Sequence, residues 1–500
     1  MRQSGFASGA ALTRRLAGAA VLACGVLLAP AMAWAQAPTT GNTPSQRDRG
    51  ATPAAAPQAP AANSTSRSMR VPPGSWMQPS QQRAIVPAPN ENRFVPDEVL
   101  FELAPNAEAD AVLRRYGATL IASQRFELAG VTIIRAKLEP GRDLRAVLTQ
   151  MGDDNSITSA QPNFLFGLQQ GAQGKPAASA TPAEPTTASS DASAVPAAQG
   201  LQSGASETAA RGSAVVRRML PPQYVVDKLR LGETRKFALG RGIRVALIDS
   251  GVDMEHPEIS GSVVAYLDAV DGQATPHAHG TSMATAIVGH GELQGMAPAA
   301  RLIVARAFGG PQATSANGKS FQILTALDWV VQQRAKVVNL SFAGPQDRLL
   351  SKALAGAKER GVIAVAAAGN GGSRAAPLYP GADPSVIAVT ATDAEDKVFA
   401  DANRGGYVAI AAPGVDVLTA EPAGRYAFTS GTSIAAAHVS GLVALLLEKQ
   451  PELDSDGARK ILGESAVDLG SKGRDPVFGA GRIDPVAALG RVLPVATARP

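Results

Sequence analysis

The chain has 500 residues, of which 45% are hydrophobic and 4% aromatic, and its formal net charge is +5. This length exceeds the needs of one domain, so we expect two folded units joined by linkers. The charge excess is small for the length, and no block of Lys and Arg is interleaved with aromatic residues. These features exclude the usual nucleic-acid-binding surfaces, and we expect no nucleic-acid partner.

Residues 1–35 have the pattern of a secretory signal peptide. Arg14-Arg15 precede an apolar run at 16–28, and the small-x-small sequence Ala33-Trp34-Ala35 follows. We expect cleavage after this sequence and export to the periplasm or the extracellular space. Three alternatives stay open: a twin-arginine signal, a lipid on Cys24, or an uncleaved anchor. Only a lipid or a retained anchor would give the protein a membrane tether.

Two further segments have the composition of disordered chain. They are rich in Ala, Pro, Gln, Ser and Thr, so they cannot bury enough apolar surface to offset the entropy lost on ordering. We predict low-complexity linkers at 36–92 and 169–214, and a tail at 493–500.

Residues 93–168 have the element order of a small split-βαβ domain. The predicted elements are a strand at 97–103, a helix at 108–116, strands at 120–128 and 131–138, a helix at 144–151 and a strand at 157–168. This region contains no histidine, and its acidic residues are scattered. The pattern favours a folding or binding module over a catalytic domain.

Residues 215–492 alternate between short apolar runs and helical segments. The predicted strands are 243–248, 302–307, 337–342, 362–367, 386–390 and 408–411, and the predicted helices are 280–288, 321–333, 347–360, 433–448 and 455–464. Continuous rather than alternating apolar strands are typical of a parallel sheet covered on both faces. We therefore predict an α/β fold with a doubly wound parallel sheet, in which ligands bind at the carboxyl ends of the strands.

Four polar residues follow these strand ends or begin the helices beside them: Asp249, His279, Asn370 and Ser433. Each has an ordinary structural explanation, as a loop cap, a turn residue or a helix N-cap. Together they supply an orienting acid, a base, an oxyanion donor and a nucleophile, and the order Asp, His, Ser is that of one known serine-protease arrangement. A zinc pair of His277 and His279 is the rival explanation. We do not expect a metal there, because their spacing suits a strand better than a helix and the carboxylate support is limited to Asp249.

This region resembles the subtilisin-like serine peptidases, over about residues 222–490. The resemblance is carried by Asp249-Ser250-Gly251-Val252-Asp253, His279-Gly280-Thr281, Ala367-Ala368-Gly369-Asn370 and Gly431-Thr432-Ser433. It implies hydrolysis of peptide bonds in polypeptide substrates through an acyl-enzyme. Ser433 would be the nucleophile, His279 the base and Asp249 its orienting acid, while the Asn370 side chain and the Ser433 N–H would bind the oxyanion.

The same resemblance implies a substrate cleft. Residues Ser341, Phe342, Ala343 and Gly344 would pair with the substrate backbone as an added strand, and Ala367, Ala368 and Gly369 would form a wall of the S1 pocket. Leu378 would lie near the base of that pocket, and the Tyr379–Pro380 bond would be cis. The domain at 93–168 resembles the family's propeptides, so the chain's own N-terminal domain is expected to be a partner that inhibits the enzyme until it is cleaved.

The sequence also departs from the family pattern. Ile434 and Ala437 replace the usual methionine and proline after the serine, and Ser282 replaces a frequent histidine. The helix after His279 leaves no room for the usual calcium loop, and Glu258, which aligns with a calcium ligand, would lack its partners. We therefore expect no metal or other cofactor, with weaker calcium sites left open. A catalytically silent, subtilisin-like binding or regulatory protein is the alternative function.

Overall fold

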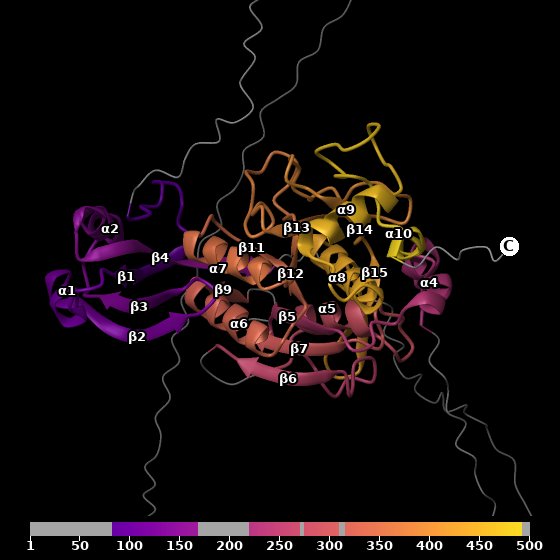
Figure 1. Cartoon of the computed structure of the whole chain (residues 1–500), viewed down its shortest axis with the longest axis horizontal. Coiled ribbons are helices and arrows are strands. Elements are labelled where there is room, and N and C mark those ends of the chain that lie inside the picture. Colours follow the sequence, from indigo (N-terminus) through magenta and orange to yellow (C-terminus); the bar gives the residue numbers. More distant parts are fainter. Residues whose placement is uncertain (1–82, 169–219, 271–274, 310–315, 493–500) are drawn as a thin grey trace, which may run out of the picture. The chain divides into compact units, whose positions relative to one another are not determined.

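The computed structural model describes residues 83–168, 220–270, 275–309 and 316–492. All of them lie in one compact unit, Met77–Pro500. The predicted signal peptide at 1–35, the linker at 169–214, the tail at 493–500 and most of the linker at 36–92 lie outside the described residues (Figure 1).

The N-terminal domain has the predicted β-α-β-β-α-β order. Its elements are β1 (Phe94–Leu103), α1 (Ala109–Arg115), β2 (Ala118–Phe126), β3 (Val131–Leu138), α2 (Leu144–Asp153) and β4 (Ile157–Leu168). The strands form an antiparallel sheet in the order β2-β3-β1-β4. This part of the secondary-structure prediction is confirmed.

The N-terminal domain includes residues that the sequence assigned to the linker. Ala84, inside the predicted linker, is buried and forms a bridge with Ala160 of β4. The Arg145 guanidinium of α2 donates hydrogen bonds to the carbonyl groups of Pro87 and Glu91, at 3.2 and 2.7 Å. These contacts fix a segment whose composition resembles that of the predicted linker before it, because a short pairing and one arginine satisfy its backbone.

The C-terminal domain is built on a parallel seven-stranded sheet in the order β14-β13-β12-β10-β5-β7-β6. The strands are β5 (Arg244–Asp249), β6 (Val263–Asp268), β7 (Arg301–Arg306), β10 (Val337–Leu340), β12 (Ile363–Ala367), β13 (Val386–Thr392) and β14 (Ile410–Pro413). The predicted doubly wound α/β fold is confirmed. The edge strand β6 was not predicted, and its side chains are mostly half-buried rather than enclosed.

Helices cover both faces of this sheet. Alternate strand residues point to opposite faces, so Val245 and Leu247 of β5 pack with α5 (Ala278–Val288) and α8 (Thr432–Lys449). Ala246 and Ile248 pack in the other core, with α6 (Ser320–Gln332) and α7 (Arg348–Glu359). That second core is continuous with the core of the N-terminal domain.

Helix α8 runs through the centre of the C-terminal domain (Figure 1). Its length and mean hydropathy of 1.2 would allow it to cross a membrane, but 89% of the apolar window is buried inside the protein. Burial of this kind is what the core helix of a folded domain shows.

Smaller elements complete the domain. They are α3 (Tyr224–Lys228), α4 (Leu231–Phe237), β8 (Phe308–Gly309), β9 (Asn317–Lys319), β11 (Phe342–Ala343), α9 (Ser455–Ser465), α10 (Pro485–Val492) and the hairpin β15 (Val417–Glu421) with β16 (Arg425–Thr429). Strands β9 and β11 do not join the parallel sheet. They pair with β4 of the N-terminal domain, on opposite edges of that strand.

Candidate active site

Asp249 and His279 meet at the carboxyl end of β5. Asp249 is the last residue of that strand, and His279 lies in the first turn of α5; both are at most 1% exposed. The imidazole Nδ1 atom is 2.7 Å from the carboxylate Oδ1. An ionised carboxylate only accepts hydrogen bonds, so this contact requires the proton on Nδ1 and leaves Nε2 as the basic nitrogen. Nε2 is buried and has no hydrogen-bond partner among the described residues.

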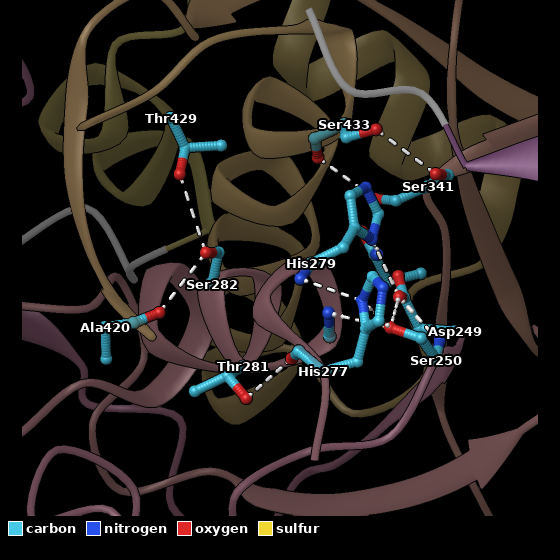
Figure 2. A network of polar contacts seen from close by, with 12 residues as sticks. Asp249, Ser250, His277, His279, Thr281, Ser282, Ser341, Ala420, Thr429 and Ser433 are labelled. Atoms are coloured by element: carbon cyan, nitrogen blue, oxygen red, sulfur yellow. Dashed lines mark hydrogen bonds and ion pairs between the residues drawn. The ribbon is translucent and has the colours of Figure 1, made fainter. Parts of the chain in front are cut away.

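Ser433 lies at the start of α8, one residue after the helix begins at Thr432. The preceding N-cap, Gly431, has φ 146° and ψ 164°, a backbone conformation open to glycine and strained for other residues. The Ser433 hydroxyl donates to the Ser341 carbonyl at 3.1 Å, and the Ser341 hydroxyl donates to the Ser433 carbonyl at 3.0 Å. Figure 2 shows the His279 ring between Ser433 and Asp249. The serine, histidine and aspartate therefore gather at one place.

Asn370 follows β12 and is tied to the same helix start. Its side-chain oxygen accepts hydrogen bonds from the Thr432 N–H at 3.1 Å and from the Thr432 hydroxyl at 2.7 Å. The backbone donor identifies this atom as the amide oxygen. The NH₂ group of Asn370 is therefore the opposite half of the amide. Thr432 itself receives the Gly369 N–H at 3.2 Å, so the loop after β12 and the start of α8 hold each other in place. Sequence reasoning did not single out Thr432.

Strand β11 (Phe342–Ala343), within the predicted substrate-binding segment 341–344, already has a partner strand. Phe342 and Ala343 pair antiparallel with Leu168 and Gly167, the last residues of β4. The other edge of β4 pairs with β9, where Phe166 lies opposite Gly318. The end of the N-terminal domain thus forms the middle strand of three, along the segment that was predicted to bind substrate backbone.

Phe166 fills an aromatic pocket in the C-terminal domain. Its side chain is fully buried and meets the Phe342 ring edge-on, with centroids 5.8 Å apart. Phe342 in turn packs against Phe308 at 4.9 Å. A Cβ atom on Gly344 would lie 2.4 Å from the Phe166 ring, so the pocket requires glycine at that position.

A second contact joins β4 to the N-termini of α6 and α7. The Asp347 carboxylate, which caps α7 through the Leu350 N–H, also accepts the Gln161 side-chain amide at 2.7 Å and the Ser320 hydroxyl. Burial is the main cause that raises the pKa of Asp347, and its hydrogen bonds act in the opposite direction. Asn163 of β4 accepts the Phe321 N–H of α6 at 3.2 Å. Polar groups of β4 thus satisfy both helix starts.

Glu258, which aligns with a calcium ligand of the family, is fully buried. Its Oε1 atom accepts hydrogen bonds from the Glu292 N–H and the Tyr426 hydroxyl, at 2.9 and 3.0 Å. Its Oε2 atom accepts from the Gly291 and Leu293 N–H groups, at 3.1 and 2.9 Å. A carboxylate has about four acceptor positions, so these donors occupy all of them. The residues present do not fit a calcium ion.

The rival explanation for His277 and His279 was a zinc pair. Among the described residues, no group of three or more His, Cys, Asp or Glu side chains is arranged to hold a metal. The Nδ1 atom of His277 is 2.9 Å from the Ser250 hydroxyl. His438 is buried in α8, where its Nδ1–H donates to the Pro413 carbonyl at 2.9 Å, and burial lowers its pKa to about 4. His438 is therefore a core residue of the peptidase domain.

The departures from the family pattern lie in packed positions. Ile434 and Ala437 are fully buried in the core around α8. The Ser282 hydroxyl donates to the Ala420 carbonyl at 3.2 Å and accepts from Thr419 at 3.0 Å, which ties α5 to the unpredicted hairpin β15–β16 (Figure 2). The Tyr379–Pro380 bond is cis, as the resemblance implied. A Cβ atom on Gly369 would lie 2.9 Å from the Leu378 side chain, so Leu378 packs beside the predicted S1 wall.

Comparisons with known proteins agree with this fold. Residues 240–481 match the subtilase family, and residues 80–163 match the fervidolysin N-terminal prodomain. Thermitase of Thermoactinomyces vulgaris is 34% identical over 232 residues, which is 45% of this chain and 81% of thermitase. Fervidolysin of Fervidobacterium pennivorans is 32% identical over 281 residues, covering 49% of this chain and 40% of fervidolysin.

The solved structure of fervidolysin, described as a keratinolytic enzyme related to subtilisin, superposes with a TM-score of 0.64 at 24% identity. The match covers 83% of this chain and 63% of that chain, and at this identity it shows the fold alone. The fold and the thermitase match together define the class of protein as a serine endopeptidase built on a subtilisin-like domain behind a prodomain. The chain belongs to the subtilase family.

Proposed function

We propose that this chain is the autoinhibited precursor of an exported serine endopeptidase whose triad is Asp249, His279 and Ser433. The 2.7 Å contact between His279 Nδ1 and the Asp249 carboxylate carries the proposal. It supports the tautomer with the hydrogen on Nδ1 and the lone pair on Nε2, which is the form that a general base needs.

In the proposed reaction, the Ser433 hydroxyl attacks the carbonyl carbon of the scissile peptide bond. Nε2 of His279 takes the hydroxyl proton, and Asp249 stabilises the resulting imidazolium. The tetrahedral oxyanion is bound by the Asn370 NH₂ group and by the Ser433 N–H, at a helix start where backbone donors lack helical acceptors. Collapse of the intermediate passes the proton from His279 to the leaving amine and leaves an acyl-Ser433. Water then hydrolyses the ester by the reverse proton transfers.

Autoinhibition is supported by the position of β4. A peptide substrate that adds a strand to β11 needs the same backbone groups that Gly167 and Leu168 occupy. The buried Phe166 ring and the Gln161–Asp347 hydrogen bond add to this docking. Substrate therefore enters only after the N-terminal domain leaves or is cut. We also propose that no calcium ion binds at Glu258, whose acceptor positions are filled.

Replacing Ser433 by Ala in the full-length chain tests the catalytic assignment. We expect the variant to lose casein hydrolysis, self-processing and labelling by a fluorophosphonate, because each requires the serine nucleophile. Ser471→Ala, at an exposed serine, is the matched control and should behave as the wild type. A wild-type chain that no fluorophosphonate labels after removal of the N-terminal domain would instead favour the silent binding protein. An N-terminus at Gln36 in the secreted product tests export.

A further inference from the structure

One nitrogen atom of His277 touches both elements that carry the proposed acid–base pair. Its Nδ1 lies 2.9 Å from the Ser250 hydroxyl, which directly follows Asp249 at the end of β5. The same Nδ1 accepts the backbone N–H of His279 at 3.2 Å, as the N-cap of α5. The backbone N–H of His277 donates to the Gly251 carbonyl at 2.9 Å, which binds the two elements again.

The Ser250 hydroxyl has two possible acceptors for its single proton. Its oxygen is 2.9 Å from His277 Nδ1 and 3.1 Å from Asp249 Oδ1, and it accepts the Gly280 N–H at 3.1 Å. His277 Nδ1 accepts a backbone N–H, so this nitrogen carries no proton of its own and is able to accept from the hydroxyl. The hydroxyl proton is therefore shared between the imidazole and the carboxylate.

The sharing of this proton changes the hydrogen bonds that Asp249 Oδ1 receives. Besides the Ser250 hydroxyl, this atom receives His279 Nδ1 at 2.7 Å and the Ser250 N–H at 2.7 Å. Every donor to a carboxylate stabilises its charge and weakens its hold on the other donors. When His277 draws the hydroxyl proton away, Asp249 binds the imidazole N–H of His279 more strongly.

Two titratable side chains lie beside the contact between His277 and Ser250: Asp249 from β5 and His279 from α5. In the turn that follows β5, the Asp253 N–H donates to the Thr281 hydroxyl at 3.0 Å, and the Asp253 carboxylate accepts the Ala423 N–H at 2.9 Å. The Thr281 hydroxyl in turn donates to the His277 carbonyl at 2.9 Å. These contacts hold the backbone of His277 and leave its Nδ1 directed at Ser250 (Figure 2).

We infer that His277 is a positioning residue of the catalytic site, which acts through Ser250 on Asp249 and through its helix cap on His279. The inference rests on the proposed triad. It requires a neutral imidazole whose Nδ1 accepts a hydrogen bond. An asparagine at position 277 offers an amide oxygen at a similar distance from the backbone and is also a good N-cap, whereas alanine offers no acceptor.

The test compares His277→Ala, His277→Asn and Ser250→Ala, singly and with Ser250→Ala combined with each His277 variant, after removal of the N-terminal domain. For His277→Ala we expect kcat on a peptide substrate to fall about tenfold, with KM nearly unchanged. This is the effect expected from the loss of one hydrogen bond to a charged group. The acid limb of kcat/KM should move to lower pH by about half a unit, because the hydrogen bond from His279 to Asp249 weakens. His277→Asn should recover most of both effects. In the Ser250→Ala background, His277→Ala should lower kcat by clearly less than tenfold, because only the loss of the helix cap remains.

A proton NMR measurement gives a readout that does not need activity. The His279 Nδ1–H bonded to Asp249 should give a low-field signal, which should move upfield in His277→Ala and return in His277→Asn. The inference is wrong if neither kcat, the acid limb nor this signal changes, if asparagine fails to rescue, or if the full effect persists without the Ser250 hydroxyl. Failure of the proposed function looks different: a wild-type enzyme without peptidase activity, or a Ser433→Ala variant that retains it.

Discussion

Phe166, in the last strand of the N-terminal domain, meets Phe342 of the peptidase domain edge-on, with ring centroids 5.8 Å apart. Both side chains are fully buried, although 176 positions separate them in the sequence. The backbone of β4 continues from this contact along β11. One aromatic side chain therefore anchors the strand that covers the proposed substrate path.

Removing that anchor should loosen the N-terminal domain. In the inactive Ser433→Ala chain, Phe166→Ala should lower the free energy of unfolding by about 3 kcal/mol, since it removes a large buried ring and leaves a cavity. Urea unfolding followed by tryptophan fluorescence and circular dichroism measures the change. Leu120→Ala is the matched control, because this β2 side chain is 54% exposed and should cost little. Equal effects of the two substitutions would contradict the anchoring role.

The buried carboxyl group of Asp347 should make the docked precursor sensitive to pH. Its pKa is raised by burial, so the folded chain binds this proton more tightly than the unfolded chain does. Stability from this group is then present at low pH and is lost as the pH rises from the unfolded pKa through the folded pKa. Asp347→Asn keeps an oxygen for Gln161 and Leu350 and an NH₂ for the Ser320 hydroxyl.

In the Ser433→Ala chain, Asp347→Asn should therefore be neutral or stabilising at pH 7, whereas Asp347→Ala should cost about 2 kcal/mol by leaving buried donors unpaired. Urea unfolding at several pH values measures both. A loss from asparagine as large as that from alanine would mean that the negative charge itself stabilises the docked state.

Most features that were predicted from the sequence are set by residues close together in the chain. Strand β4 was predicted with its observed ends, and α5 to α9 were predicted within two residues, because periodicity and caps are local signals. The four proposed catalytic residues were found because each sits at a strand end or a helix start. The Gln161–Asp347 hydrogen bond joins residues 186 positions apart, and no local pattern encodes it.

Sequence reasoning missed two further features, of which only the hairpin β15–β16 had a local signal. Residues 417–421 and 425–429 flank a short turn with Pro422 and Gly424, a pattern that predicts a hairpin, yet its polar Thr419 and Thr429 obscured the apolar alternation. Ala84 and its neighbours were assigned to the linker because the composition changes gradually there. The pairing with Ala160 that orders them depends on a strand 76 residues away.

His438 should make the peptidase domain sensitive to acid, in the opposite direction to Asp347. Its pKa is lowered to about 4 by burial, so the unfolded chain, with an ordinary value near 6.5, binds the proton more tightly. Stability from this group is full above that ordinary value and is lost as the pH falls toward 4, by about 3 kcal/mol in all. His438→Gln, which does not titrate there, should flatten the loss between pH 7.5 and 4.5 in urea unfolding of the Ser433→Ala chain. An unchanged slope would assign the acid sensitivity to other groups.

The Glu258 carboxylate should replace a metal ion in holding the turn after α5 against the hairpin β15–β16. Its four hydrogen bonds come from the backbone at 291–293 and from Tyr426 of β16, so the loop and the hairpin share one buried charge. Glu258→Gln places two N–H donors where acceptors are needed and should cost about 3 kcal/mol, whereas Tyr426→Phe removes one donor and should cost about 1–2 kcal/mol. The wild-type melting temperature should be the same in EDTA and in millimolar calcium chloride. A rise with calcium that disappears in Glu258→Gln would show that the carboxylate does bind the ion and would overturn this assignment, while a rise that persists in the variant would locate calcium at another site.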